Sequence, residues 1–281
     1  MLRIKNIKVK SFFSIMGVFI MAFSIMAILL KQSESKAVNS EELKEVNHII
    51  INSDVTNIEI LKSETKIHYK LSGKASFFIK PKLALKYDKG QATLTVKAIP
   101  KKWMYFIPGN VKRTTLQLFI PERLLSSIKV HTKNGNIHLE DIEVINHTTL
   151  VSNIGNIKVD SFKGSSIQVI AKNGAIIMGK VKGEVAINNH VGSLKEITFS
   201  EIIGKNTIKL SNGNAKILLP SSQDLTDIQL NIETKNGHIT TNNTQLKNHI
   251  IINGAGQNIK SNNFKNRELN ISVSVGNIEI N

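Results

Sequence analysis

Two acidic residues near the middle of the chain are the first candidates for chemistry. Glu140 and Asp160 stand at the same place in two successive units of a repeated motif, each five positions after a glycine. If such units stack as neighbouring strands, the two carboxyl groups lie about 5 Å apart, which is the separation in a retaining glycosidase. The next two units carry Gly179 and Ile197 at this position. Because no acidic groove continues, solvated turn carboxylates explain the pair better than catalysis does.

Two histidines flank the first Asn-Gly pair of the motif. His131 and His138 are expected to face each other on the outer surface of the fold, but no third ligand follows at a spacing that suits a metal ion. The sequence has no cysteine, which excludes disulfides, thiolate catalysis and thiolate metal sites. We therefore predict no catalytic residue, no metal and no cofactor, and we expect a protein that is not an enzyme. A glycan-active enzyme is the least favoured alternative.

The elements that must carry these residues are strands. Apolar and polar residues alternate with a period of two along most of the chain after residue 48, as in ATLTVKA at 92–98 and TLQLFI at 115–120. Useful helical periodicity is absent after residue 30. With 41% hydrophobic residues, the 281-residue chain has enough apolar material for one large core or two modest ones. The body of the protein is predicted to be all-β.

A unit of about 20 residues recurs through the second half of the chain. Its glycines stand at Gly135, Gly155, Gly174, Gly192, Gly213, Gly237, Gly256 and Gly276. The residue two positions after the glycine is apolar in seven of the eight units, and the residue directly after it is mostly small or an amide. If the units stack in register, the apolar residues share one core and the amides form a ladder.

Two architectures fit this unit: a β-solenoid with one turn per repeat, or a series of antiparallel hairpins closed by Asn-Gly turns. A type I′ hairpin turn needs positive φ at both central residues, yet Ile154, Val191 and Val275 precede the glycine in three units. A corner that needs positive φ only at glycine tolerates every unit. We therefore favour a β-solenoid-like stack of about eight units.

The N-terminus is predicted to be a membrane anchor. Residues 11–30 form an uncharged, mostly apolar run of bilayer-spanning length, preceded by a basic tail at 1–10. The positive-inside bias places this tail in the cytoplasm and the rest of the chain outside the membrane. A cleaved signal peptide is the alternative, but the run is long and no clean cleavage site follows. The absence of cysteine in an exported chain fits a Gram-positive bacterium.

Three further regions complete the expected domain organisation. Residues 31–47 are polar and charged and are predicted to be a juxtamembrane linker, with Ser40 as the N-cap of a short helical turn. Residues 48–125 lack the glycine repeat and are predicted to be an irregular β region that caps one end of the solenoid. Residues 126–281 are predicted to be the solenoid itself.

The run LQLFIPERLLSSIKVHTKNGNIHLEDI at 116–142 resembles the signature of the bacterial putative adhesin family, and part of its pattern recurs as ILLP at 217–220. The resemblance covers roughly residues 48–281. It implies an extracytoplasmic β-solenoid, preceded by an anchor in membrane-bound members, and it transfers no catalytic residue. It also implies one alternative function, that of a regulatory or sensing partner of a membrane protein in a cell-envelope stress response.

Positive charge is concentrated between the anchor and the repeats. The chain carries a net charge of +16, and residues 62–113 contain thirteen Lys and Arg against two acidic residues, a local charge of +11. The candidates for binding an anionic surface are Lys80, Lys82, Lys86, Lys97, Lys101, Lys102, Lys112 and Arg113. Within this stretch Trp103, Tyr105 and Phe106 are candidates for contact with the membrane interface, with a hydrophobic cap on the first coil or a ligand pocket as alternatives.

Outside a bacterial membrane the abundant anions are lipid head groups and wall polymers such as teichoic acids. We therefore expect a single-pass, membrane-anchored envelope protein that binds these anions, and no nucleic acid. A merely solvated basic surface is the competing explanation of the same charge.

Overall fold

The computed structural model describes residues 16, 17, 20, 21, 24, 35–64, 66–75, 79–100, 114–121, 125–261 and 266–281. Strands dominate the described chain from residue 35 onward, where the short helical elements are η2 (Leu225–Asp227) and α2 (Thr244–Lys247). Within these ranges no helix has the length and apolar character needed to cross a bilayer. The anchor expected at 11–30 lies almost entirely outside the described residues.

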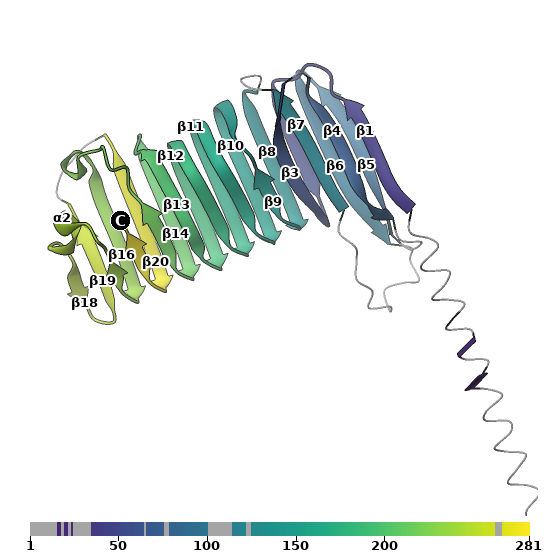
Figure 1. Ribbon diagram of the computed structural model, residues 1–281. Coiled ribbons are helices and arrows are strands. Elements are labelled where there is room, and N and C mark those ends of the chain that lie inside the picture. Colours follow the sequence, from purple (N-terminus) through teal and green to yellow (C-terminus); the bar gives the residue numbers. More distant parts are fainter. Residues whose placement is uncertain are drawn as a thin grey trace, which may run out of the picture.

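The strands stack in two ladders that enclose one hydrophobic core (Figure 1). The first ladder contains, in spatial order, β5 (Ile79–Asp88), β6 (Gln91–Pro100), β2 (His48–Ser53), β8 (Ser127–Asn134), the C-terminal parts of β10 (Ile142–Ile154), β11 (Ile157–Asn173) and β12 (Ile176–Val191), then β14 (Lys205–Asn212), β20 (Glu268–Val275), β16 (Gln229–Asn236), β19 (Gly256–Lys260) and β18 (Ile251–Asn253).

The second ladder contains β1 (Ser35–Glu42), β4 (His68–Ala75), β7 (Thr114–Pro121), β3 (Thr56–Ser63), β9 (Ile137–Leu139), the N-terminal parts of β11 and β12, then β13 (Leu194–Glu201), β15 (Ala215–Leu218), β21 (Ile278–Ile280) and β17 (Ile239–Thr240). Successive units pair in parallel, as coils of a solenoid do, whereas hairpins would pair them antiparallel. The solenoid-like, all-β architecture expected from the sequence is confirmed.

The spatial order of the coils differs from their order in the chain. The coil of β2 and β3 lies between the coil of β6 and β7 and the coil of β8 and β9. Near the other end β20, drawn in yellow in Figure 1, lies between β14 and β16. Where the sequence predicts an irregular cap at 48–125, the strands β2, β3, β6 and β7 therefore join the parallel stack. Antiparallel strands close the two ends, with β5, β4 and β1 at one end and β19 and β18 at the other.

Glycine is required where each coil turns from the first ladder into the second. A methyl group on Gly174, whose φ is +154°, would overlap the carbonyl oxygen of Gly155 in the neighbouring coil. The same contact recurs along a stack of Gly135, Gly155, Gly174, Gly192, Gly213, Gly276 and Gly237. Gly256 is the exception, because it belongs to the terminal β18–β19 hairpin. Lys89 is the single described non-glycine residue with positive φ, so the β-branched residues before the glycines are unstrained, as expected.

The amide ladder predicted beside these glycines is present. The Asn156 backbone N–H donates to Asn136 Oδ1 over 2.9 Å, and the Ala175 N–H donates to Asn156 Oδ1 over 2.8 Å. Further along, the Asn277 N–H donates to Asn214 Oδ1 over 2.8 Å. Each amide thus pairs a corner N–H of the next coil, which would otherwise have to find a partner in solvent.

A second row of polar side chains lies three positions before the glycines. These side chains point inward and stabilise the corners through hydrogen bonds. Thr132 Oγ1 donates to the Thr56 carbonyl, Ser152 Oγ to the Gly135 carbonyl, and Thr234 Oγ1 to the Gly276 carbonyl, over 2.7 to 3.3 Å. These hydroxyls are buried and bond across coils, which explains why the motif carries Thr or Ser among its apolar residues.

The shared core expected two positions after the glycines is also confirmed. Its residues are at most 4% exposed and comprise Ile137, Ile157, Ile176, Leu194, Ile239 and Ile278. Asn258, the polar member of the series, lies outside this core because its unit forms the antiparallel β19 strand.

The segment before residue 48 differs from its prediction. Instead of a helical turn beginning at Ser40, Ser35–Glu42 forms strand β1, which pairs antiparallel with β4. Leu43 and Val46 then enter the core. Pairing satisfies the backbone groups along the edge of β4, and burial of two apolar side chains fixes the segment that follows.

Candidate functional site

The lysines of the predicted basic surface lie on the hairpin of β5 and β6, here called the basic hairpin. Lys82 and Lys97 are direct cross-strand partners, and Lys86 stands four pairs further along on the same strand, opposite Thr93. All three side chains are exposed, and none forms an ion pair with a residue that the structure describes. Like charges opposite each other on a strand pair repel. A bound anion would reduce this repulsion and stabilise the hairpin.

The structure gives less information on the other residues that were predicted to bind an anionic surface or the membrane interface. Lys80 is placed by its backbone alone, opposite Ile99. Lys101, Lys102, Lys112, Arg113, Trp103, Tyr105 and Phe106 lie outside the described residues.

Glu140 directly follows β9, and Asp160 lies on β11 one position after the register partner of Leu139, as expected, but their carboxylates have different partners. Glu140 Oε2 accepts from the backbone N–H of Lys62 over 2.9 Å. Asp160 instead lies 2.7 Å from His138 Nε2 and 2.6 Å from Lys158 Nζ. Glu140 is thus fixed by a backbone group, whereas Asp160 is held by two basic side chains.

The electrostatics of Asp160 also oppose acid catalysis. Partial burial raises the pKa of the Asp160 carboxyl, but the hydrogen bonds and charges of Lys158 and His138 outweigh it and leave the pKa below its usual value. A general acid in glycoside hydrolysis needs a raised pKa, because it must hold its proton until the leaving group departs.

The two histidines do not meet. His131 lies on β8 in the first ladder and His138 on β9 in the second, on either side of the Gly135 corner. His138 bonds to Asp160 instead. Among the described residues no group of three or more His, Asp or Glu side chains is arranged to hold a metal ion.

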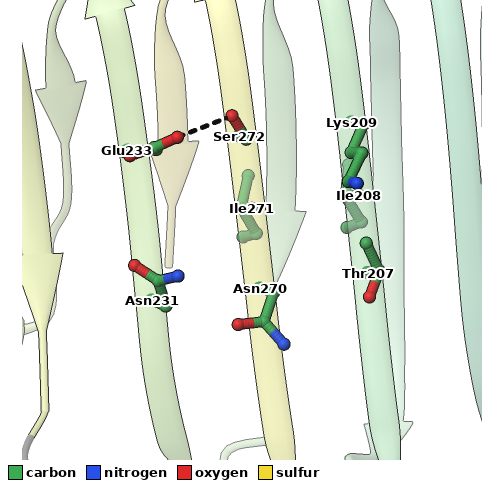
Figure 2. Close-up of a pocket in the computed structure, with 8 residues that line it drawn as sticks. All are labelled: Thr207, Ile208, Lys209, Asn231, Glu233, Asn270, Ile271 and Ser272. Atoms are coloured by element: carbon green, nitrogen blue, oxygen red, sulfur yellow. Dashed lines mark hydrogen bonds between the residues drawn. The ribbon is translucent and has the colours of Figure 1, made fainter.

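Sequence reasoning missed a polar groove of about 270 Å³ on the outer surface of the first ladder (Figure 2). Two rows of side chains from β14, β20 and β16 line it. One row consists of Thr207, Asn270 and Asn231, and the other of Lys209, Ser272 and Glu233. Ile208 and Ile271 complete the lining, but their side chains are at most 1% exposed, so the floor is mainly backbone.

Short side chains form the hollow, and hydrogen bonds fix part of its rim. Ser272 Oγ donates to Glu233 Oε1 over 2.9 Å, the contact dashed in Figure 2. Asn270 Nδ2 donates to Glu268 Oε2 over 3.2 Å. Asn231 Oδ1 is shielded from solvent and has no hydrogen-bond partner in the structure. The only sequence signal for this groove is a set of outward polar residues, and its assembly depends on β20 entering between β14 and β16.

Several solved structures and one family model show similarity to the chain. Solved structures with similarity to the chain include a putative adhesin from Bacteroides fragilis, with 12% identity, a TM-score of 0.41, and coverage of 89% of this chain and 98% of that one. Another is a putative cell adhesion protein from Clostridium sporogenes, with 14% identity, a TM-score of 0.34, and coverage of 88% and 99%. A putative lipid binding protein from Parabacteroides distasonis has 10% identity, a TM-score of 0.28, and coverage of 88% and 97%.

These structural similarities are too distant to inform the function. No curated protein matches the sequence significantly. A family model does match, and it spans residues 46–179, from just before β2 to just past Gly174, the third of the stacked corner glycines. The model that matches residues 46–179 is that of the Toastrack DUF4097 family.

Proposed function

We propose that the chain is a non-enzymatic, membrane-anchored envelope protein, with the character of an adhesin, whose basic hairpin binds phosphate groups outside the membrane. The observation that carries this proposal is the direct pairing of Lys82 and Lys97, with Lys86 on the same exposed face, where none of the three forms an ion pair with a described residue. Phosphates of wall polymers and of lipid head groups share the chemistry that such a surface binds. Each lysine near an anionic membrane contributes about 1 kcal/mol.

The position of β1 supports a location near the membrane. If residues 11–30 span the bilayer, four residues separate the span from Ser35, where β1 begins. Four residues reach at most about 14 Å. β1 and the basic hairpin belong to the same end of the stack (Figure 1), so the tether would hold that end close to the outer leaflet.

A binding role also agrees with the state of the candidate carboxylates. Glu140 accepts from a backbone N–H, and Asp160 is held as a carboxylate between Lys158 and His138. Neither is arranged to exchange a proton with a substrate, so we propose that the surface binds without reacting.

The test is binding of the protein to vesicles of anionic phosphatidylglycerol, to vesicles of neutral phosphatidylcholine, and to purified teichoic acid. We expect binding to the anionic vesicles or to teichoic acid that weakens strongly between about 0.1 and 1 M salt, because the Debye length falls from about 10 Å to 3 Å. Comparison of the two anionic probes distinguishes lipid from wall polymer.

The matched variants are Lys82→Gln/Lys97→Gln and Lys172→Gln/Lys195→Gln. Each removes two positive charges, but Lys172 and Lys195 are exposed on strands β11 and β13, away from the basic hairpin. The first variant should lose most of the binding and the second should keep it. Equal loss in both, or no binding to either anion at low salt, would contradict the proposal.

A further inference from the structure

We infer that the polar groove on β14, β20 and β16 is a binding site for an uncharged saccharide, separate from the basic hairpin and independent of its function. The size of the groove fits this ligand class. Residues two apart on a strand are about 7 Å apart and neighbouring strands about 4.8 Å, so the two rows enclose an area of about 7 by 10 Å. The volume of about 270 Å³ is below that of most pockets for drug-sized molecules and suits one or two sugar rings.

The chemistry of the lining favours hydroxyl groups. Because Ile208 and Ile271 point into the core, an apolar ligand would gain little contact in the groove. The exposed groups are two amides, two hydroxyls, one carboxylate and one ammonium. Sugar hydroxyls both donate and accept hydrogen bonds, so they can satisfy all of these groups together.

Several of these groups retain unused bonding capacity. Glu233 bonds to Ser272 through Oε1, and its Oε2 has no protein partner in the described structure. Lys209 forms no ion pair with a described residue, and Ser272 separates it from Glu233 in the register. Asn231 Oδ1 is unsatisfied, and rotation of the amide toward the groove would let a ligand hydroxyl donate to it.

The charge balance distinguishes this groove from the basic hairpin. One lysine and one glutamate leave the lining with no net charge, and the Glu233 carboxylate would repel a phosphate placed beside it. An uncharged polyhydroxylated ring avoids this repulsion. No aromatic side chain lines the groove to stack on a sugar, so we expect binding of one ring to be weak, with dissociation constants of about 1 mM.

The inference can be tested with the full-length chain labelled with ¹⁵N-asparagine. The probes are N-acetylglucosamine, its short β-linked oligomers, methyl glucoside and inorganic phosphate. Saccharide should shift the side-chain amide signals of Asn231 and Asn270 in a saturable manner, and phosphate should not. The absence of saturable shifts with every saccharide, or equal shifts with phosphate, would overturn the assignment.

Matched variants locate the site. Glu233→Gln keeps an acceptor for Ser272 and should fold normally, yet it should weaken saccharide binding about tenfold, because a hydrogen bond to a charged group is lost. Lys209→Gln removes the charge at the other end and should weaken binding as well. The control Glu279→Gln changes an exposed glutamate on β21 in the second ladder and should leave binding unchanged. Equal weakening by Glu279→Gln, or full binding by both groove variants, would refute the site.

Discussion

Substitution of one corner glycine is expected to destabilise the whole stack. In Gly174→Ala the new methyl group would overlap the Gly155 carbonyl oxygen, and the residue would have to keep a φ of +154°. The strained backbone costs about 1 to 3 kcal/mol. Relief of the overlap must push two hydrogen-bonded coils apart, at a cost comparable to overpacking a core, about 1 to 3 kcal/mol. The expected loss of about 2 to 6 kcal/mol is a large share of the stability of an ordinary domain.

The matched control is Gly90→Ala in the turn between β5 and β6. Gly90 also has a positive φ, +79°, but open space surrounds the position of its missing methyl group. Only the backbone cost of about 1 to 2 kcal/mol applies there. Equilibrium urea unfolding of both variants, followed by circular dichroism, measures the difference. If Gly174→Ala lies within about 0.5 kcal/mol of Gly90→Ala, close coil packing is not the reason for the glycine stack.

Four further predictions follow from other features. Ile157 is fully buried, so Ile157→Ala should lower the free energy of unfolding by about 2 to 4 kcal/mol; a change below 0.5 kcal/mol would contradict the shared core. Burial, followed by its hydrogen bond to Glu41, raises the pKa of Tyr69 to about 12. Because that pKa is raised, the Tyr69 contribution to stability is present below the ordinary pKa of 10.0 and is lost as the pH rises toward 12. Alkaline titration of stability should therefore be shallower in Tyr69→Phe, and identical curves would contradict this. The lowered pKa of Asp160 has the opposite sign, since its contribution is lost as the pH falls. Asp160→Asn should destabilise the protein at neutral pH and make no difference in strong acid, while an effect independent of pH would indicate another cause. Finally, we expect the protein to stay in the membrane fraction with residues 11–30 attached, whereas release into the medium with a new N-terminus near Ala37 would show that the segment is a signal peptide.

The candidate site was only partly predictable. The local charge identified Lys82, Lys86 and Lys97 as candidates, but the pairing of β5 with β6 brings them onto one exposed face. The glycine repeat put Glu140 and Asp160 in register but said nothing of their side-chain partners. Lys62 and Glu140 are far apart in the sequence, and the bond between them depends on β3 lying beside β9.

Strand class, corner position and core residues were determined by the sequence itself. These features are local: a glycine at the corner is required by close approach of the backbone, and an apolar residue two positions later must face inward whichever coil lies next to it. This is why the stacked glycines and the buried Ile137 and Ile157 agree with the pattern.

The order of the coils was decided only by the tertiary structure. Coils of one period present similar apolar faces and similar backbone edges, so the alternating pattern does not distinguish one neighbour from another. The order of the coils depends on particular side chains at the corners and on the strands that are inserted or added at the ends of the stack. Thr56 replaces glycine at the corner next to Gly135, β20 and β21 enter between earlier coils, and the polar segment Ser35–Glu42 becomes a strand because the edge of β4 is free to pair with it. The polar groove results from these long-range choices, since it unites residues of β14, β20 and β16, whereas the basic hairpin is formed by two strands that are adjacent in the sequence.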